Sequence, residues 1–478
     1  MHFLMNKDTV VGYIEIQKGE LGSNYTFQPK KNIPLPIGFK SIDTWLENRK
    51  ASKHNSHLRQ IMRECGCEQT EGFIKITHAA SINDTFWVKS DNEDIVWSQV
   101  SFYTNRFDET ISKLAFEGLE LYGLKLSHTS PELSTEGSFR KCWIRENDSG
   151  IYLYKRGGSD ARNMGLEPYC EVMASEIAAK LLGHKAVEYE LANLHHELAS
   201  KCLLFTDEKY GYTPVSRFDI NSSSADTLLS FYRKIGCEDE FRRMLVLDAI
   251  TFNTDRHSGN HGVLVENSTQ KPIKMAPVFD FNLSLLPYIE EDDMTDIGTT
   301  LEKYTPCIGN DFTRIGQTAL TSSIRSDLIG LKGFKFSFQG DSRFTHKRVA
   351  FIETLINRQI DAILSKDVLY THDVFIPKRR GENIEKSKEE ILSEKIWTLS
   401  HIEEYFAAYD FVEESPYSYM TLFPKQDVHK EIQLNLSTGD IFIFADGEKL
   451  DSKINEEVYT EFNELLKLVK NAFDKANV

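Results

Sequence analysis

Three polar residues between 253 and 280 have the types and spacing that phosphoryl transfer needs. Asp255 and Asn260 are separated by four residues in NTDRHSGNHG after a predicted helix, and Asp280 lies twenty positions further on, at the end of a predicted apolar strand in APVFDF. The reaction needs a carboxylate near the attacking hydroxyl and oxygen ligands for Mg²⁺ on the nucleotide phosphates. We expect Asp255 to orient the hydroxyl and accept its proton late, and Asn260 and Asp280 to bind the metal ions. Alternatively, Asp255 and Asn260 are turn residues and Asp280 is a helix cap.

The two histidines of the same segment offer a competing metal site. His257 and His261 are four positions apart beside Asp255, and such a pair binds zinc when a helix puts both rings on one face. Ser258 and Gly259 disfavour a helix here, so phosphoryl transfer is the preferred interpretation. His257 is then expected to hold the catalytic loop by hydrogen bonds.

The segment from 129 to 219 is expected to grip the nucleotide. KCWIRE, the turn NDSG and IYLYKR predict a hairpin, and Lys155 near its end could reach the α- and β-phosphates. A helix is predicted over EPYCEVMASEIAAKLL with Gly183 as its stop, and Glu171 on that helix is expected to hold Lys155 by an ion pair. A lysine at a strand end is usually a solvated surface residue. The ordered series from Lys155 to Asp280 is therefore more informative than any one member.

The rest of the chain predicts an α+β protein of several parts. Strands are expected in VVGYIEI, HAASINDTFWVK and IVWSQVSFYTN, and helices in DEFRRMLVLDAITF, HKRVAFIETLINRQIDAIL and NELLKLVKNAF. A short helix is expected after the loop IPLPIGFKS, and IQLNLSTGDIFIF predicts a second hairpin. The expected parts are an N-terminal α+β region at 1–128, a β-rich part at 129–219, a mainly helical part at 220–375, a charged linker at 376–395 and a C-terminal α+β unit at 396–478.

These motifs resemble those of the HipA-like serine/threonine kinases, a toxin family of bacterial toxin–antitoxin systems, over roughly 130–365. The most specific pieces are N-x-D-x-H-x-x-N, which starts at Asn253, and A-P-x-x-D, which ends at Asp280. The resemblance implies a bilobal protein-kinase-like fold, with 129–219 as a β-rich N-lobe and 220–375 as a helical C-lobe. It also implies that ATP and Mg²⁺ are used to phosphorylate Ser or Thr of a protein.

A second motif of the family, S-x-x-G-x-x-x-K, is present as Ser134, Gly137 and Lys141. In the family this loop covers the nucleotide phosphates, and phosphorylation of its serine expels the loop and inactivates the kinase. The resemblance therefore makes Gly137 a nucleotide-binding residue and Ser134 a candidate autophosphorylation site. Thr135 and Ser138 are neighbours that could serve equally.

A third motif, R-F-D after a strand, is the family's hinge, whose backbone meets adenine. It is present here at Arg217, Phe218 and Asp219, with Ser216 where an acidic residue is often found. The resemblance thus makes Ser216 and Phe218 candidate nucleotide contacts. The partner of such kinases is often a small helix-turn-helix DNA-binding protein, so an antitoxin-like partner is expected beside the protein substrate.

Composition narrows the setting in which this chemistry is expected. A net charge of -16 disfavours direct nucleic-acid binding, and no run approaches the ~20 apolar residues of a membrane helix. Seven scattered cysteines predict free thiols, and no signal peptide is evident, so we expect a cytoplasmic protein. Two other functions remain open: a non-catalytic pseudokinase that serves as a scaffold, and a phosphotransferase acting on a lipid or other small molecule.

Overall fold

The computed structural model divides the chain into two compact units. It describes all residues except 20–21, 51–60, 64, 68, 118–129, 136–138, 147–149, 159–164, 223, 291–292, 296–300, 302, 366–408, 416–418, 425–429, 436–440, 446–447 and 450–478, and it gives only the backbone of 18–19, 22–23, 295 and the strands between 409 and 449. One unit comprises Met1–Phe312 and Phe334–Ile356, and the other comprises Thr313–Gly333 and Asn357–Val478. The five-part division expected from the sequence stays a prediction.

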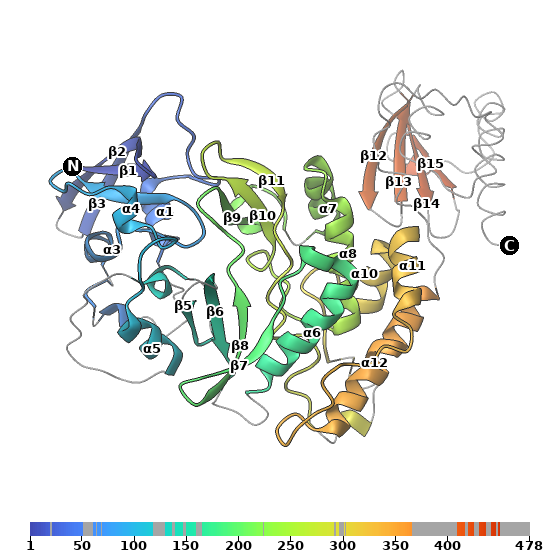
Figure 1. The fold of residues 1–478 in the computed structure, drawn as a ribbon. Helices are drawn as coiled ribbons and strands as arrows, with labels where there is room; N and C mark the ends of the chain where they lie inside the picture. The colour runs from blue at the N-terminus through green and yellow to red at the C-terminus, as the bar shows by residue number, and fades with distance from the viewer. Residues whose placement is uncertain are drawn as a thin grey trace, which may run out of the picture. The chain divides into compact units, whose positions relative to one another are not determined.

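The N-terminal part of the first unit is built on an antiparallel sheet with strand order β3-β2-β1-β4 (Figure 1). Its elements are β1 (His2–Asn6), β2 (Thr9–Gly19), β3 (Gly22–Pro29), α1 (Ile42–Glu47), α3 (Thr70–Thr77), β4 (Phe86–Ser90), α4 (Trp97–Val100), α5 (Glu109–Glu117) and the 3₁₀ turn η1 (Pro131–Ser134). The strand expected in VVGYIEI and the helix expected after IPLPIGFKS are confirmed. Ser41 caps the N-terminus of α1, and its hydroxyl oxygen accepts the N–H of Thr44.

The strand expected over IVWSQVSFYTN is wrong, because this segment forms the short helix α4 and turns. Trp97 and Val100 are three positions apart and both buried, so one turn of helix puts them on the same side. Gln99 Oε1 accepts the N–H of Val96, and the Trp97 indole donates to Glu208 Oε1 at 2.9 Å. These polar contacts favour a capped turn over an extended strand, which the alternation of aromatic and polar residues could not reveal.

A second antiparallel sheet, with strand order β5-β6-β8-β7, carries the segment expected to bind nucleotide. Its elements are β5 (Lys141–Glu146), β6 (Gly150–Arg156), α6 (Glu167–Leu182), the 3₁₀ turn η3 (Gly183–Lys185), β7 (Glu190–Leu194) and β8 (Glu197–Leu203). The predicted pairing of KCWIRE with IYLYKR is confirmed, and α6 packs on β8 (Figure 1). The helix stops at Gly183 as expected, at a φ of 56° that favours glycine.

A third sheet, with strand order β11-β10-β9, and two helices make up the region that contains Asp255, Asn260 and Asp280. The elements are β9 (Tyr210–Pro214), the 3₁₀ turn η4 (Val215–Arg217), α7 (Ala225–Lys234), α8 (Glu238–Thr251), β10 (Gly262–Glu266) and β11 (Lys271–Met275). The strand expected over APVFDF is wrong. Only Val278 pairs there, in an isolated bridge with Ala186, because Pro277 has no N–H to donate and Asp280 turns the backbone to a φ of 63°.

The remaining elements include three helices and a five-stranded antiparallel sheet in the order β12-β13-β14-β15-β16. They are η5 (Asp293–Thr295), α10 (Phe312–Ala319), α11 (Ser322–Gly330), α12 (His346–Leu364), β12 (Tyr409–Ser415), β13 (Tyr419–Pro424), β14 (Lys430–Asn435), β15 (Ile441–Ala445) and β16 (Glu448–Lys449). The helix expected over HKRVAFIETLINRQIDAIL and the β14–β15 hairpin are confirmed. The linker at 376–395 and the terminal helix in NELLKLVKNAF lie outside the described residues. Mixed helices and antiparallel sheets thus confirm the α+β class, whereas the bilobal arrangement stays a prediction.

The N-terminal sheet and the second sheet share one apolar core. Met5 and Trp87 come from β1 and β4, and they belong to the same buried cluster as Trp143 of β5 and Ile151 of β6. Phe116 of α5 belongs to a separate cluster, with residues that alternate with these on β5 and β6. Hydrophobic residues on both sides therefore fix the strand that carries Lys155.

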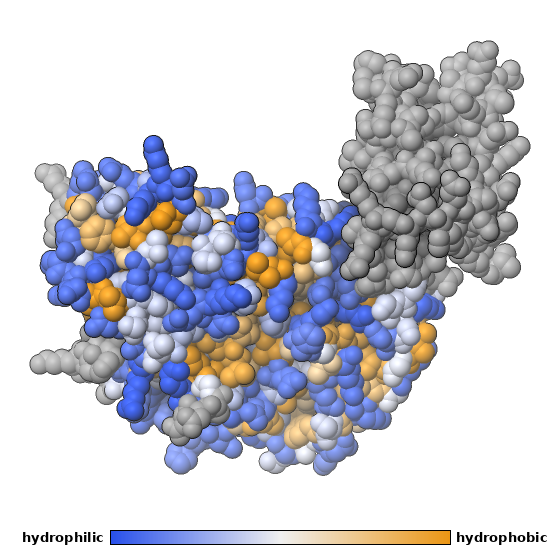
Figure 2. All heavy atoms as spheres, turned by 45° about the horizontal axis from the view of Figure 1, so that its top comes forward, coloured by the Kyte–Doolittle hydropathy of each residue, from blue (hydrophilic) through white to orange (hydrophobic). Residues whose placement is uncertain are grey.

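Polar and charged residues cover most of the described surface in Figure 2, with apolar residues gathered in separate areas between them. Within the described part of the chain, no helix is both long enough and apolar enough to span a bilayer. All seven cysteines belong to that part, and each is a free thiol, as expected. Six of them are buried and Cys307 is exposed.

Candidate active site

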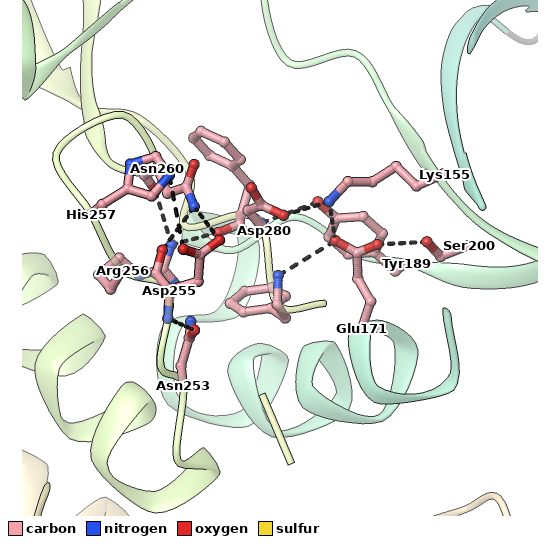
Figure 3. Close-up of polar contacts among 12 residues, drawn as sticks. Lys155, Glu171, Tyr189, Ser200, Asn253, Asp255, Arg256, His257, Asn260 and Asp280 are labelled. Carbon is pink, nitrogen blue, oxygen red and sulfur yellow. Dashed lines mark hydrogen bonds and ion pairs between the residues drawn. The ribbon is translucent and has the colours of Figure 1, made fainter. Parts of the chain in front are cut away.

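Lys155 and Glu171 form the ion pair that the sequence predicted. Lys155 Nζ lies 2.5 Å from Glu171 Oε1, and the lysine is only 8% exposed. The pair meets because β6 places Lys155 opposite Ser200 of β8, while α6 packs on β8 and carries Glu171. Ser200 Oγ donates to Glu171 Oε2 at 2.5 Å. Both oxygens of Glu171 are therefore engaged, and its side chain is held toward the lysine (Figure 3).

Asp280 contacts the same ammonium from the other side. Its Oδ1 lies 2.6 Å from Lys155 Nζ although the two residues are 125 positions apart (Figure 3). Side chains also hold the backbone here: Tyr189 Oη accepts the N–H of Asp280 at 3.2 Å, and Glu171 Oε1 accepts the N–H of Phe281 at 3.4 Å. Asp tolerates the left-handed conformation better than most residues, so these contacts can stabilise the φ of 63°.

The loop after α8 is closed on itself around Asp255. Asn253 Oδ1 accepts the N–H of Asp255 at 3.0 Å, and Asn260 Nδ2 donates to the Asp255 carbonyl at 2.8 Å. The same Asn260 nitrogen lies 3.4 Å from Asp255 Oδ2. The loop is thus a turn, as one alternative proposed, and the turn also gathers polar side chains. Asp280 is close enough to Asp255 to raise its pKa, and Asn260 contacts Asp255, so the three residues expected to share one site do lie together (Figure 3).

Arg256 points inward although it directly follows Asp255. It is 2% exposed, and its guanidinium pairs with Asp248 of α8 through Nε–Oδ2 at 2.8 Å and Nη2–Oδ1 at 3.0 Å. Its Nη1 donates to the carbonyl of Asn260 at 2.8 Å and to that of Phe279 at 2.6 Å. Arg256 therefore contacts both segments of the site.

The two histidines occupy different environments, which disfavours a shared zinc ion. His257 is exposed, and its Nδ1 accepts the N–H of Gly259 at 3.0 Å, a hydrogen bond inside the loop of the kind expected. His261 is buried, with Nδ1 2.9 Å from the hydroxyl of Tyr232, and burial lowers its pKa to about 3. Over the described residues, no group of three or more His, Cys, Asp or Glu side chains is suited to hold a metal ion.

The charged groups of the site set one another's protonation. Burial alone would lower the pKa of Lys155, but Asp280 and Glu171 outweigh it and raise that pKa above its ordinary value. Burial would raise the pKa of Asp280, yet Lys155 holds it below its ordinary value. Burial does raise the pKa of Asp255, with His257 opposing and Asp280 adding to the rise. Asp280 is therefore a stable anion, while Asp255 is a stronger base than an ordinary aspartate.

The donor set of the site fits Mg²⁺ on a nucleotide. Oδ1 of Asp280 contacts Lys155, and among the described residues no hydrogen bond reaches its Oδ2. The amide nitrogen of Asn260 is engaged by Asp255, so its amide oxygen is the atom that would face a metal ion. Such hard oxygen donors suit Mg²⁺, which keeps several waters. An ammonium has three N–H donors, so the two carboxylates leave Lys155 one donor for a phosphate.

The structure places Ser134 in a buried turn. Ser134 ends η1, and its hydroxyl donates to the carbonyl of Pro131 at 3.2 Å. Gly137 lies outside the described residues. Lys141, the last residue of that motif, begins β5 and is close enough to help lower the pKa of Asp280. The end of the predicted phosphate loop is therefore near the site, while its role stays a prediction.

The predicted hinge is tied to the Asp255 loop by backbone. The N–H of Ser216 donates to the carbonyl of Ser258 at 3.0 Å, and the N–H of Phe218 donates to that of Val215 at 2.9 Å. The Phe218 ring packs against Phe231 of α7, with centroids 4.8 Å apart. Both N–H groups are engaged within the chain, so adenine could reach them only by exchanging these bonds. The adenine contact of Ser216 and Phe218 stays a prediction.

Sequence reasoning missed three residues that hold the site, namely Ser200, Tyr189 and Arg256. Each acts through a contact between elements distant in sequence, and a serine or tyrosine in a strand-rich segment carries no distinctive signal. The sequence shows Arg256 directly after Asp255 in NTDRHSGN, but a charged residue in a polar loop is usually solvated, so burial is not expected there. Ser200 lies opposite Lys155 because β6 pairs with β8, and this pairing between distant strands has to be known before the neighbour of Lys155 can be predicted.

No family model matches the chain, and no curated protein matches it. Among the solved structures similar to it is the Helicobacter pylori proinflammatory kinase CtkA, at 18% identity over 48% of this chain and 91% of that chain, with a TM-score of 0.37. Another is a chain of the Shewanella oneidensis MR-1 toxin–antitoxin complex of HipA, HipB and operator DNA. That similarity has 11% identity over 77% of this chain and 100% of that chain, with a TM-score of 0.46.

Proposed function

We propose that this protein is an ATP-dependent, Mg²⁺-requiring kinase that transfers the γ-phosphate to a Ser or Thr hydroxyl of a protein. The observation that carries the proposal is the buried Lys155 ammonium between Glu171 and Asp280, 2.5 and 2.6 Å from their oxygens. Phosphoryl transfer depends mostly on positioning and on charge stabilisation, and this arrangement supplies both. The serine or threonine acceptor is supported by the motif resemblance.

Each side chain then has one task. Lys155 binds the α- and β-phosphates, and Glu171 keeps its ammonium in place. Asp280 and Asn260 hold Mg²⁺, which when bound neutralises charge on the phosphate oxygens. Asp255 orients the acceptor hydroxyl and takes its proton late, helped by a pKa above the ordinary aspartate value.

The cellular setting and partners follow from the resemblance and from composition. We infer a cytoplasmic kinase with a helix-turn-helix antitoxin-like partner, and the partner would carry any contact with DNA. Ser134 is the proposed autophosphorylation site. Because its hydroxyl is buried against Pro131, the turn must open before Ser134 can accept a phosphate.

Labelled ATP tests the proposal directly. Purified protein is incubated with Mg²⁺ and γ-labelled ATP, and intact mass is measured before and after. We expect phosphate incorporation or ATP turnover, lost by about 100-fold or more in Asp255→Ala and Asp280→Ala. Asp43→Ala, at an exposed position of α1, is the matched control and should retain full activity. Full transfer by both site variants would contradict the assignment.

Two further outcomes separate the competing functions. Nucleotide binding without turnover in the wild type indicates a pseudokinase scaffold. Transfer to a small molecule or lipid, with no protein labelled, indicates the other phosphotransferase. Ser134→Ala should remove an autophosphorylation mass increase, and persistence of that increase would move the modification to another residue.

A further inference from the structure

We propose that Arg256 is a positioning residue that sets the distance between the Asp255 loop and Asp280. The inference rests on the proposed function, because it concerns the alignment of the base with the metal ligand. It assigns a role to a residue at an unspecified position of the N-x-D-x-H-x-x-N motif, between Asp255 and His257. Its basis is the set of contacts that one guanidinium makes to both segments.

One nitrogen of Arg256 joins the two segments. Nη1 donates to the carbonyl of Asn260, which ends the loop begun by Asp255, and to the carbonyl of Phe279, which precedes Asp280. The two acceptor residues are nineteen positions apart, and these hydrogen bonds measure 2.8 and 2.6 Å. Because they share a nitrogen, the guanidinium cannot follow one carbonyl without changing the length of the hydrogen bond to the other.

The position of Asp280 depends on these hydrogen bonds, because side chains hold the backbone around it. Three consecutive residues there are held by side chains: the Phe279 carbonyl by Arg256, the Asp280 N–H by Tyr189 and the Phe281 N–H by Glu171. Asp280 lies in no strand, so sheet hydrogen bonds do not fix its position. Of the three side chains, Arg256 is the one that also bonds the Asp255 loop.

Arg256 is itself fixed at its other edge. Nε and Nη2 pair with the two oxygens of Asp248, whose Oδ1 also accepts from Asn253 Nδ2 at 3.0 Å. The guanidinium carbon lies 5.7 Å from the centroid of the Phe281 ring. Only the planar fork of arginine can pair with a carboxylate along one edge and donate to two carbonyls along the other. A lysine keeps the charge but not this geometry.

An arginine that only stabilises the fold should, when replaced, lower stability without altering the site. The chain offers a matched control for this alternative. Arg242 lies on α8, is 3% exposed and pairs with Glu238 through Nε at 2.8 Å. Arg256→Lys and Arg242→Lys each replace a buried, paired arginine by a lysine. Both should lower the thermal midpoint of the full chain, whereas only Arg256→Lys should alter the site.

The experiment compares wild type and both variants in single-turnover transfer and in nucleotide-induced thermal shift. We expect Arg256→Lys to lose about 100-fold in transfer rate per folded molecule, as a shift near 1 Å can do. Its half-maximal rate should require more Mg²⁺. The thermal shift by a non-hydrolysable ATP analogue without metal should be kept, and the added shift with Mn²⁺ should be lost. Arg242→Lys should behave like wild type in all these readouts.

Asp248→Asn provides a second variant if Arg256→Lys does not fold. It removes the charge that orients the guanidinium but leaves Nη1 able to reach the carbonyls, so we expect about a 10-fold loss of rate. Wild-type rate and Mn²⁺ shift in the folded Arg256 variant, or losses equal to those of Arg242→Lys, would overturn the positioning role. A wild type that neither binds the nucleotide analogue nor transfers phosphate would reject the proposed function instead.

Discussion

Replacing Lys155 by methionine should make the stability of this protein strongly dependent on pH. The lysine lies between two carboxylates, and the side chain of Glu171 is only 1% exposed. Removing one partner of a buried ion pair destabilises a protein by about 3–5 kcal/mol, because the other charge stays buried. Glu171 can avoid that cost only by binding a proton.

The expected loss of stability follows from the free energy needed to protonate Glu171. Keeping a glutamate of ordinary pKa ~4.3 neutral costs about 5 kcal/mol at pH 8 and about 1.6 kcal/mol at pH 5.5, at 1.36 kcal/mol per pH unit. Burial already raises the folded pKa of Glu171, and loss of the opposing lysine raises it further. A raised folded pKa means that stability is greatest at low pH and falls as pH rises above the unfolded value. We therefore expect Lys155→Met to lose about 3–5 kcal/mol at pH 8 and under about 2 kcal/mol at pH 5.5.

Urea unfolding from pH 5.5 to 8, followed by circular dichroism, measures this difference against wild type. Lys155 itself adds no slope in that range, because its raised pKa keeps it charged in both states. The control is Lys155→Met combined with Glu171→Gln, which removes both charges of that pair and should remove the pH-dependent part of the deficit, while the part due to Asp280, which also loses its Lys155 partner, remains. A deficit of Lys155→Met that is the same at both ends of the range, or a pH dependence that persists unchanged in the double variant, would refute the reasoning.

Three other predictions concern residues outside that pair. Gly38 has a φ of 73°, and a Cβ there would lie 2.3 Å from the Arg217 carbonyl, so Gly38→Ala should lower stability by about 2 kcal/mol in urea unfolding. Cys307 is the exposed cysteine among the seven, so a colorimetric thiol reagent should rapidly label one equivalent in wild type and none in Cys307→Ser. Partial burial raises the pKa of the Cys307 thiol, so its labelling rate should still climb above pH 8.5. Glu208 accepts the indole N–H of Trp97, and Glu208→Gln should cost about 1 kcal/mol in the same unfolding assay, with no change in nucleotide binding.

Local patterns were enough to predict the elements that carry the charged residues. The hairpin of KCWIRE and IYLYKR places Lys155, and the helix that stops at Gly183 places Glu171. Both depend on contacts between residues close in sequence, where turn and periodicity signals act. The ion pair expected between them forms because α6 packs on β8, the strand beside the one that carries Lys155.

The errors occurred where tertiary contacts decide the backbone. Asp280 was expected at the end of a strand, yet Pro277 breaks the pairing and side chains from distant elements hold the turn. Nothing local to APVFDF announces the tyrosine at 189 or the arginine at 256. Likewise, the contacts of Trp97 with Glu208 override an alternation typical of strands. A buried arginine and a solvated one look alike in a single sequence.

The apolar core shared by β1, β4, β5 and β6 has a consequence for synthesis on the ribosome. Trp87 and Met5 emerge early, but Trp143 and Ile151, which complete their cluster, are translated more than fifty residues after Trp87. Until then the nascent chain exposes tryptophan and methionine side chains to solvent. A stall before residue 151 should therefore leave a protease-sensitive N-terminal intermediate that a chaperone can recognise, and release of the stall should convert it to a resistant form.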